Sequence, residues 1–194
     1  MIPGTIGLSR IVGTPGRLIH AGQLLCGEEP KYARWTHSFI YVGNVDGKGT
    51  DFDIIQANTA GAERVHVSQS INHGVLLFEP RLGDMTYEHT PTAYVDRMRS
   101  AAFAAIGYVG TPYSFADYLA IAAHRWKVCL LADGIDAYVA ASKHMICSQL
   151  IDEVFIDVAT PLIPLSVPGD VLPADLARLA YTTGNMVTWS QHIV

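Results

Sequence analysis

The stretch THSFIYVGNVDGKGTDFDIIQAN, residues 36–58, contains the pattern that decides the predicted fold. Two segments rich in β-branched and aromatic residues, 37–43 and 52–58, flank a turn at 44–49 that is rich in Gly, Asp and Asn. Short apolar segments on either side of such a turn are typical of a β-hairpin. The sequence therefore predicts two antiparallel strands here.

The register of this hairpin places two polar side chains together. If Gly43 pairs with Thr50 across the turn, His37 lies opposite Gln56. Both side chains then occupy one face, because successive residues of a strand point to opposite faces. A slip of one residue would move Gln56 to the other face.

The rest of the chain extends this pattern into an α+β domain. Further strands are predicted at 22–27, 63–68 and 74–80, and helices at 90–110, 114–134, 145–155 and within 167–180. Strands followed by helices, with no linker or repeat between them, favour one α+β domain spanning residues 1–194.

Composition and charge exclude several classes of protein. The net charge is -5 and no cluster of Lys and Arg occurs, which argues against nucleic-acid partners. No window approaches the ~20 apolar residues of a transmembrane helix. The first residues lack the basic start and apolar run of a secretory signal, so a cytoplasmic or phage-borne protein is expected. The three cysteines, Cys26, Cys129 and Cys147, are irregularly spaced, which predicts neither a disulfide framework nor a metal or other cofactor site.

Cys147 is the candidate nucleophile. It lies in MICSQLIDEVF (145–155), where apolar residues recur at helical spacing, and amides at the start of a helix stabilise a thiolate. A buried structural cysteine is the competing interpretation, because free cysteines are among the most buried residues. A nearby imidazole favours the nucleophile, and His37 with Gln56 could supply a base and a group that orients it.

Five motifs in order make the chain resemble a known superfamily. They are THSFIYVGN, IIQANTAGAERVHV, GTPYSFADYLA, ICSQLI and PGDVLPADLARL. Their order and spacing resemble the circularly permuted, YiiX-like branch of the NlpC-type papain-like cysteine peptidases, over most of the chain. The resemblance implies a papain-like fold, with a small antiparallel β-sheet or barrel packed against a helical part and the active site at their junction.

The resemblance also implies roles for four residues. It makes Cys147 the nucleophile, His37 the base, Gln56 the orienting residue and Tyr113, in GTPYSF, a contributor to the oxyanion hole beside the backbone N–H of Cys147. The sequence departs from the family pattern in three places. Gln56 stands where an acid is usual, CSQL replaces CSEL, and Gln23 replaces Asp in the N-terminal GDL pattern.

The expected function is therefore cleavage of an amide bond by a cysteine-dependent hydrolase, through an acyl-enzyme. The expected substrates are peptides or acyl amides of the bacterial cell-wall type. Two alternatives remain: a lipid acyltransferase or thioesterase using the same residues, and a catalytically inactive papain-like binding protein or structural virion protein. The oligomeric state is left open.

Two further alternatives concern single histidines. His144 and Cys147, three residues apart on a helix, could ligate zinc, although no second pair has ligand spacing. His66, in the predicted strand 63–68, could replace His37 as the base.

Overall fold

The hairpin predicted from residues 36–58 lies in the middle of an antiparallel sheet. The computed structural model describes residues 1–70, 74–83, 89–113, 145–163, 171–183 and 185–187. Its strands are β1 (Ile6–Ser9), β2 (His37–Tyr41), β3 (Asp53–Asn58), β4 (Gly61–His66), β5 (Val75–Glu79) and β6 (Asn185–Val187). Within these residues they form one six-stranded sheet in the order β4-β3-β2-β1-β5-β6, with every neighbouring pair antiparallel.

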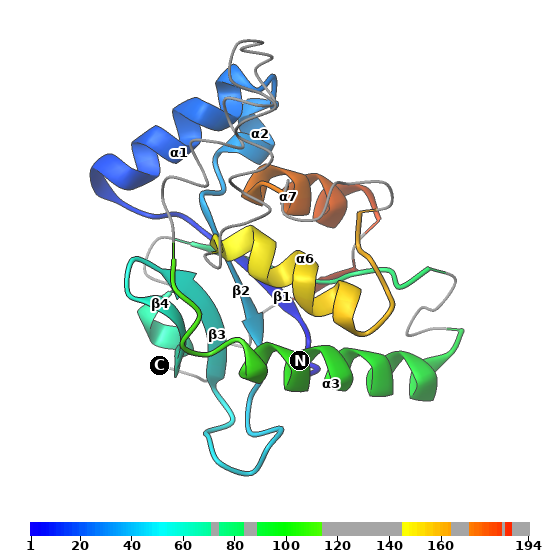
Figure 1. Ribbon diagram of the computed structural model, residues 1–194. Helices are drawn as coiled ribbons and strands as arrows, with labels where there is room; N and C mark the ends of the chain where they lie inside the picture. The colour runs from blue at the N-terminus through cyan, green and yellow to red at the C-terminus, as the bar shows by residue number, and fades with distance from the viewer. Residues whose placement is uncertain (71–73, 84–88, 114–144, 164–170, 184, 188–194) are drawn as a thin grey trace.

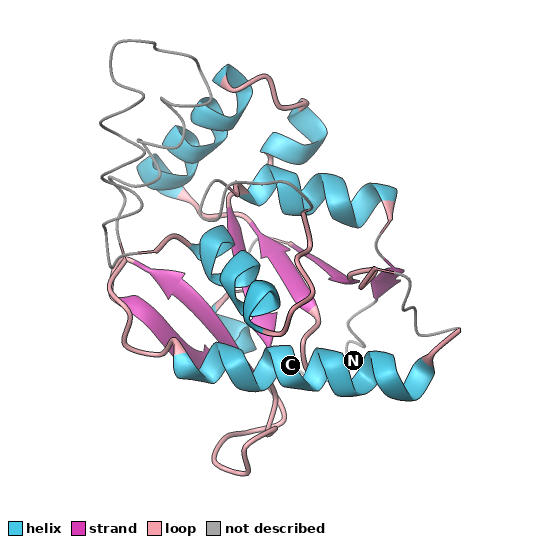
Figure 2. Ribbon diagram, turned by 45° about the vertical axis from the view of Figure 1, so that its right-hand side comes forward, coloured by secondary structure: helices cyan, strands magenta, loops and turns pink. Residues whose placement is uncertain are grey.

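Helices complete an α+β architecture. They are α1 (Gly13–Leu25), α2 (Pro30–Ala33), α3 (Pro91–Gly107), α6 (Cys147–Asp157) and α7 (Pro173–Thr182), with a 3₁₀ turn at Val67–Gln69. Proline occupies the first turn of α2, α3 and α7, where its fixed φ and missing N–H cost nothing. Figures 1 and 2 show α3 and α6 lying across the same face of the sheet.

The main core lies between this face of the sheet and the helices. Helix α6 buries its apolar stripe completely, with Leu150, Ile151, Val154 and Phe155 each 0 % exposed. These side chains join Ile40 and Ile55 of the sheet and the small residues of α3 in one cluster. The packing fixes α6 over β2 and β3, and so determines where the first residue of α6 lies.

A smaller cluster covers the opposite face of the sheet. Phe39, Ile54, Val67 and Leu77 are its buried members. The Phe39 ring lies directly over Gly7 of β1, where an added Cβ would come within 2.1 Å of the ring. Because Phe39 and His37 alternate with Ile40 and Ser38, the His37 side chain belongs to this second face.

Most of the predicted elements are confirmed, with shifted ends. Strands predicted at 37–43, 52–58, 63–68 and 74–80 correspond to β2, β3, β4 and β5, and the helices predicted at 90–110, 145–155 and within 167–180 correspond to α3, α6 and α7. The helix predicted at 114–134 lies outside the described residues. Within the part of the chain that the structure describes, no helix is long and apolar enough to cross a bilayer.

The strand predicted at 22–27 is wrong, since residues 22–25 form the last turn of α1. The reason lies in the buried face of this helix, which consists of Gly16, Ile19 and Gln23, while Leu18 and Leu25 are exposed. Apolar periodicity therefore gives no helical signal here.

The predicted register of the hairpin is also wrong, by two residues. Phe39, not His37, is the partner of Gln56, and Tyr41 pairs with Ile54. A shift of two residues preserves the face on which each side chain lies. His37 and Gln56 therefore remain on one face as diagonal neighbours, which is close enough for long side chains to meet.

Candidate active site

Cys147 is the first residue of α6, and local hydrogen bonds determine where this helix begins. Ile146 precedes it in an extended conformation, and its N–H donates to Oε1 of Gln149 at 2.8 Å. The Ser148 hydroxyl donates to the carbonyl of Val171 at 2.6 Å, which joins the first turn to the segment entering α7. The amides of a first helical turn have no carbonyl partner within the helix, so they favour negative charge nearby.

The Cys147 thiol lies against the start of β2. The residue is 4 % exposed, and its side chain forms a hydrogen bond with the His37 ring. Burial alone would raise the pKa of Cys147, but the positive charge of His37 and its hydrogen bond, with a smaller contribution from the adjacent Ser38, outweigh burial and lower the pKa. This environment favours a thiolate over a thiol.

His37 shows the complementary change. Its burial would lower the pKa of the ring, but the hydrogen bond and charge of Cys147, the hydrogen bond of Gln56 and the charge of Glu63 together raise it. A lowered thiol pKa beside a raised imidazole pKa is the signature of a thiolate–imidazolium pair. Such a pair is reactive below the ordinary pKa of cysteine, about 8.5.

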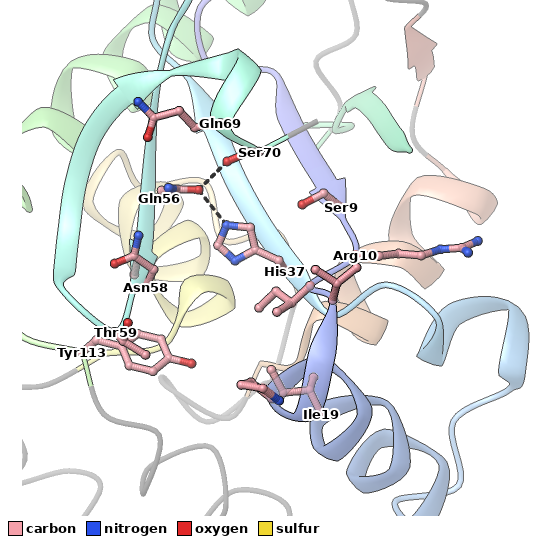
Figure 3. Close-up of a pocket in the computed structure, with 14 residues that line it drawn as sticks. Ser9, Arg10, Ile19, His37, Gln56, Asn58, Thr59, Gln69, Ser70 and Tyr113 are labelled. Atoms are coloured by element: carbon pink, nitrogen blue, oxygen red, sulfur yellow. Dashed lines mark hydrogen bonds between the residues drawn. The ribbon is translucent and has the colours of Figure 1, made fainter. Parts of the chain in front are cut away.

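Gln56 holds the His37 ring from the other side. His37 Nε2 and Gln56 Oε1 are 2.9 Å apart, and the Ser70 hydroxyl donates to the same oxygen (Figure 3). Because an amide oxygen only accepts, Nε2 carries the proton of the neutral ring. The other ring nitrogen, Nδ1, is then free to exchange a proton with Cys147.

Glu63 is a member of this network that the sequence analysis missed. It is the register partner of Gln56 on β4, and its Oε1 accepts from Gln56 Nε2 at 3.0 Å and from the Asn58 side chain. The sequence did contain a signal for this contact. Asn58 pairs with Gly61 across a tight turn, and counting back from this turn sets Gln56 opposite Glu63.

Tyr113 reaches the site through an unusual main-chain contact. The N–H of Met145 donates to the carbonyl of Pro112 at 3.0 Å, and Tyr113 and Met145 form an isolated parallel bridge two residues before the nucleophile. Figure 3 shows the Tyr113 hydroxyl directed into the cleft. Burial and the charge of Cys147 raise the pKa of Tyr113, so the hydroxyl keeps its proton and can donate a hydrogen bond.

A cleft of about 390 Å³ opens beside these residues. His37, Gln56 and Tyr113 line it, while the Cys147 side chain lies next to His37 and is almost fully covered. Most of the remaining lining falls into two walls, and Ser9 and Arg10 add polar groups at the end of β1 (Figure 3). An apolar wall comes from the start of α1 and the residues before it, and a polar wall from the β3–β4 turn and the 3₁₀ turn: Ile11, Val12, Pro15 and Ile19 against Asn58, Thr59, Gln69 and Ser70.

Gln23 holds segments next to the site through buried hydrogen bonds. Its amide nitrogen donates to the carbonyls of Ala33 and Trp35 at 2.8 and 2.9 Å, and its oxygen accepts from the N–H of Ala174 at 2.8 Å. A fully buried glutamine on α1 therefore fixes both the segment leading into His37 and the start of α7. Gln23 lies on a helix, not on the strand expected from the sequence.

The two histidine alternatives have different outcomes. His66 lies on the edge strand β4 within the described sheet, where its Nδ1 is 2.9 Å from the Ser68 hydroxyl and its ring contacts Phe52. It is therefore His37, and not His66, that the structure brings to Cys147. His144 lies outside the described residues, as does Cys129. In the described residues, no group of three His, Cys, Asp or Glu side chains has a metal-binding arrangement.

Comparison with known proteins adds no further assignment. No protein-family model matches the chain, and no curated protein matches it significantly.

Proposed function

We propose that the protein is a cysteine-dependent hydrolase of amide bonds, with a papain-like fold of the permuted NlpC type. The observation that carries the proposal is the hydrogen-bonded series Cys147–His37–Gln56, which begins at the first residue of a buried helix and borders a cleft. An α+β architecture with a helix packed on an antiparallel sheet is compatible with this fold.

In the first half of the reaction, the Cys147 thiolate attacks the carbonyl carbon of the substrate. A C–S bond forms, and the carbonyl electron pair moves to oxygen, where the N–H of Cys147 and the Tyr113 hydroxyl stabilise it. The C–N bond then breaks as the His37 imidazolium gives its Nδ1 proton to the leaving nitrogen. An amine departs and a thioester of Cys147 remains.

In the second half, neutral His37 takes a proton from water as the water oxygen attacks the thioester. The C–S bond breaks, the carboxylic acid product leaves, and the thiolate–imidazolium pair is restored. Gln56 keeps Nδ1 directed at sulfur throughout. The proposed substrates are peptides or acyl amides, including peptides of the cell-wall type.

A second candidate is cleavage or transfer of a fatty acyl group by the same residues. The apolar wall of the cleft, formed by Ile11, Val12, Pro15 and Ile19, favours it, because such a wall would accommodate an acyl chain. A panel of peptide amides and long-chain thioesters would distinguish the two functions. An amide hydrolase should turn over the peptide amides and not the thioesters, and an acyltransferase or thioesterase should do the reverse.

The direct test is the pH dependence of alkylation of each cysteine, in the wild type and in His37→Ala, followed by peptide mass spectrometry. Cys147 should react with iodoacetamide well below pH 8.5, and His37→Ala should remove this low-pH reactivity. Cys26, half-buried at the end of α1, is labelled in the same experiment, and its pH profile should not change in His37→Ala. An inert Cys147, or one that reacts equally without His37, would refute the proposal.

A further inference from the structure

A carboxylate lies one hydrogen bond beyond the amide that orients His37. Gln56 has no charge, yet its amide nitrogen donates to Oε1 of Glu63, which is its direct partner on the neighbouring strand. Asn58 donates to the same oxygen. Two amide donors of β3 thus converge on one carboxylate of β4, which places a negative charge behind the neutral member of the series.

This carboxylate determines which way the Gln56 amide faces. A carboxylate oxygen only accepts hydrogen bonds, so the NH₂ end of Gln56 must face Glu63 and the carbonyl end must face His37. The carbonyl end then accepts from His37 Nε2, which leaves Nδ1 for Cys147. A reversed amide would present a donor to Nε2 and favour the opposite tautomer.

The same contact adds to the electrostatics of the ring. A hydrogen bond from an amide N–H to an ionised carboxylate polarises the amide and increases the negative charge on its oxygen. The imidazolium of His37 is the group that benefits, and the charge of Glu63 is one of the influences that raise the pKa of His37.

We propose that Glu63 is the charged positioning residue of this site, acting on His37 through the side chain of Gln56. The proposal rests on the proposed function of Cys147 and His37 and extends it. Gln56 stands where the superfamily that the sequence resembles has an acid. Glu63 supplies the negative charge from the adjacent strand, and Gln56 transmits its effect to His37.

The competing explanation is that Glu63 only links β3 to β4, as polar cross-strand pairs commonly do. Glu63→Gln separates the two roles, because a glutamine at this position still offers an oxygen to Gln56 Nε2 and removes only the charge. If Glu63 acts through its charge, the pKa of His37 should fall in this variant, so that less imidazolium is present at pH 6 to stabilise the Cys147 thiolate. The alkylation rate of Cys147 at pH 6 should then fall about threefold or more, while the rate at pH 9 stays unchanged.

Two further variants complete the experiment. Glu79→Gln removes a half-buried carboxylate of β5 elsewhere on the sheet, and should leave the pH profile as in the wild type. Gln56→Glu combined with Glu63→Gln exchanges the two side chains, so that the carboxylate meets His37 directly and an amide still bridges the strands. This exchange should restore reactivity at pH 6, which a purely structural link would not do.

The outcomes distinguish this proposal from the proposed function. An unchanged profile in Glu63→Gln, together with lost low-pH reactivity in His37→Ala, would overturn the role of Glu63 and leave the Cys147–His37 pair intact. A shifted profile that the exchange variant fails to restore would also overturn it. If His37→Ala leaves Cys147 unaffected, the proposed function itself fails, whatever Glu63→Gln does.

Discussion

At the scale of single residues, the environment of Cys147 differs from that of an ordinary buried cysteine. Burial disfavours a thiolate, so a structural cysteine in an apolar core has a raised pKa. Around Cys147 the opposite holds, because the charge and hydrogen bond of His37, with a smaller contribution from Ser38, exceed the effect of burial. The candidate nucleophile is therefore defined by its polar neighbours and not by its exposure.

Tyr113→Phe tests the proposed oxyanion site. Removing the hydroxyl should lower kcat/KM for an amide substrate by about tenfold to a hundredfold, because one of two donors to the developing oxyanion is lost. The alkylation rate of Cys147 should stay unchanged, since attack on iodoacetamide produces no oxyanion at this position. Parallel losses in both assays would instead indicate that Tyr113 only supports the fold around Cys147.

At the scale of elements, sequence patterns predicted what is locally encoded. The strands β2 and β3 and the helix α6 carry clear apolar periodicities, and each was found within a few residues. Strand β1, only four residues long, was missed although it lies between β2 and β5. Helix α1 was missed in part because Gln23 occupies its buried face, where it serves contacts with distant segments that no local pattern contains.

The site residues show the same difference between what a local pattern predicts and what it does not. His37 and Gln56 were placed on one face from strand alternation alone, despite the error in register. Glu63 was missed because the tight turn between Asn58 and Gly61, which sets Gln56 opposite Glu63, was not used to align β4 with β3.

Gln23→Leu tests the contacts that hold α1 to the rest of the fold. The substitution should lower the free energy of unfolding by about 2–4 kcal/mol, because it leaves two buried carbonyls and one buried N–H without their present partner. Urea denaturation measures the change, with Leu18→Gln, at an exposed position of the same helix, as the control. A loss below about 0.5 kcal/mol in Gln23→Leu would show that these groups find other partners.

At the scale of the whole molecule, one buried carboxyl opposes stability at neutral pH. Asp152 of α6 is 1 % exposed, and neither of its oxygens has a hydrogen-bond partner among the residues that the structure describes. Burial raises the pKa of Asp152 to about 6, and the negative charges of Glu153 and Asp175 add to the shift. Since the folded-state pKa exceeds the unfolded value of 3.8, stability falls as the pH rises through this interval.

Asp152→Asn should therefore stabilise the protein at pH 7 to 8, by about 1–3 kcal/mol. The gain should shrink as the pH is lowered and should nearly vanish at pH 4, where the carboxyl of Asp152 is protonated in the folded protein. Urea denaturation at several pH values measures this difference. Glu153→Gln, the adjacent and more exposed acid, should give a smaller gain. Equal stability of the wild type and Asp152→Asn at pH 8 would contradict the pKa assigned to Asp152.

The separation of the site residues along the chain has a consequence for how activity arises during folding. His37 and Gln56 belong to a hairpin that can form early, whereas Cys147 joins them only by closing the loop of ~90 residues that follows Gln56, which is entropically costly. A nascent chain would carry an ordinary, unactivated thiol until α6 docks on β2. Thiol reactivity at low pH would then mark the arrival of the native topology, so pulse alkylation during refolding could time this docking event directly.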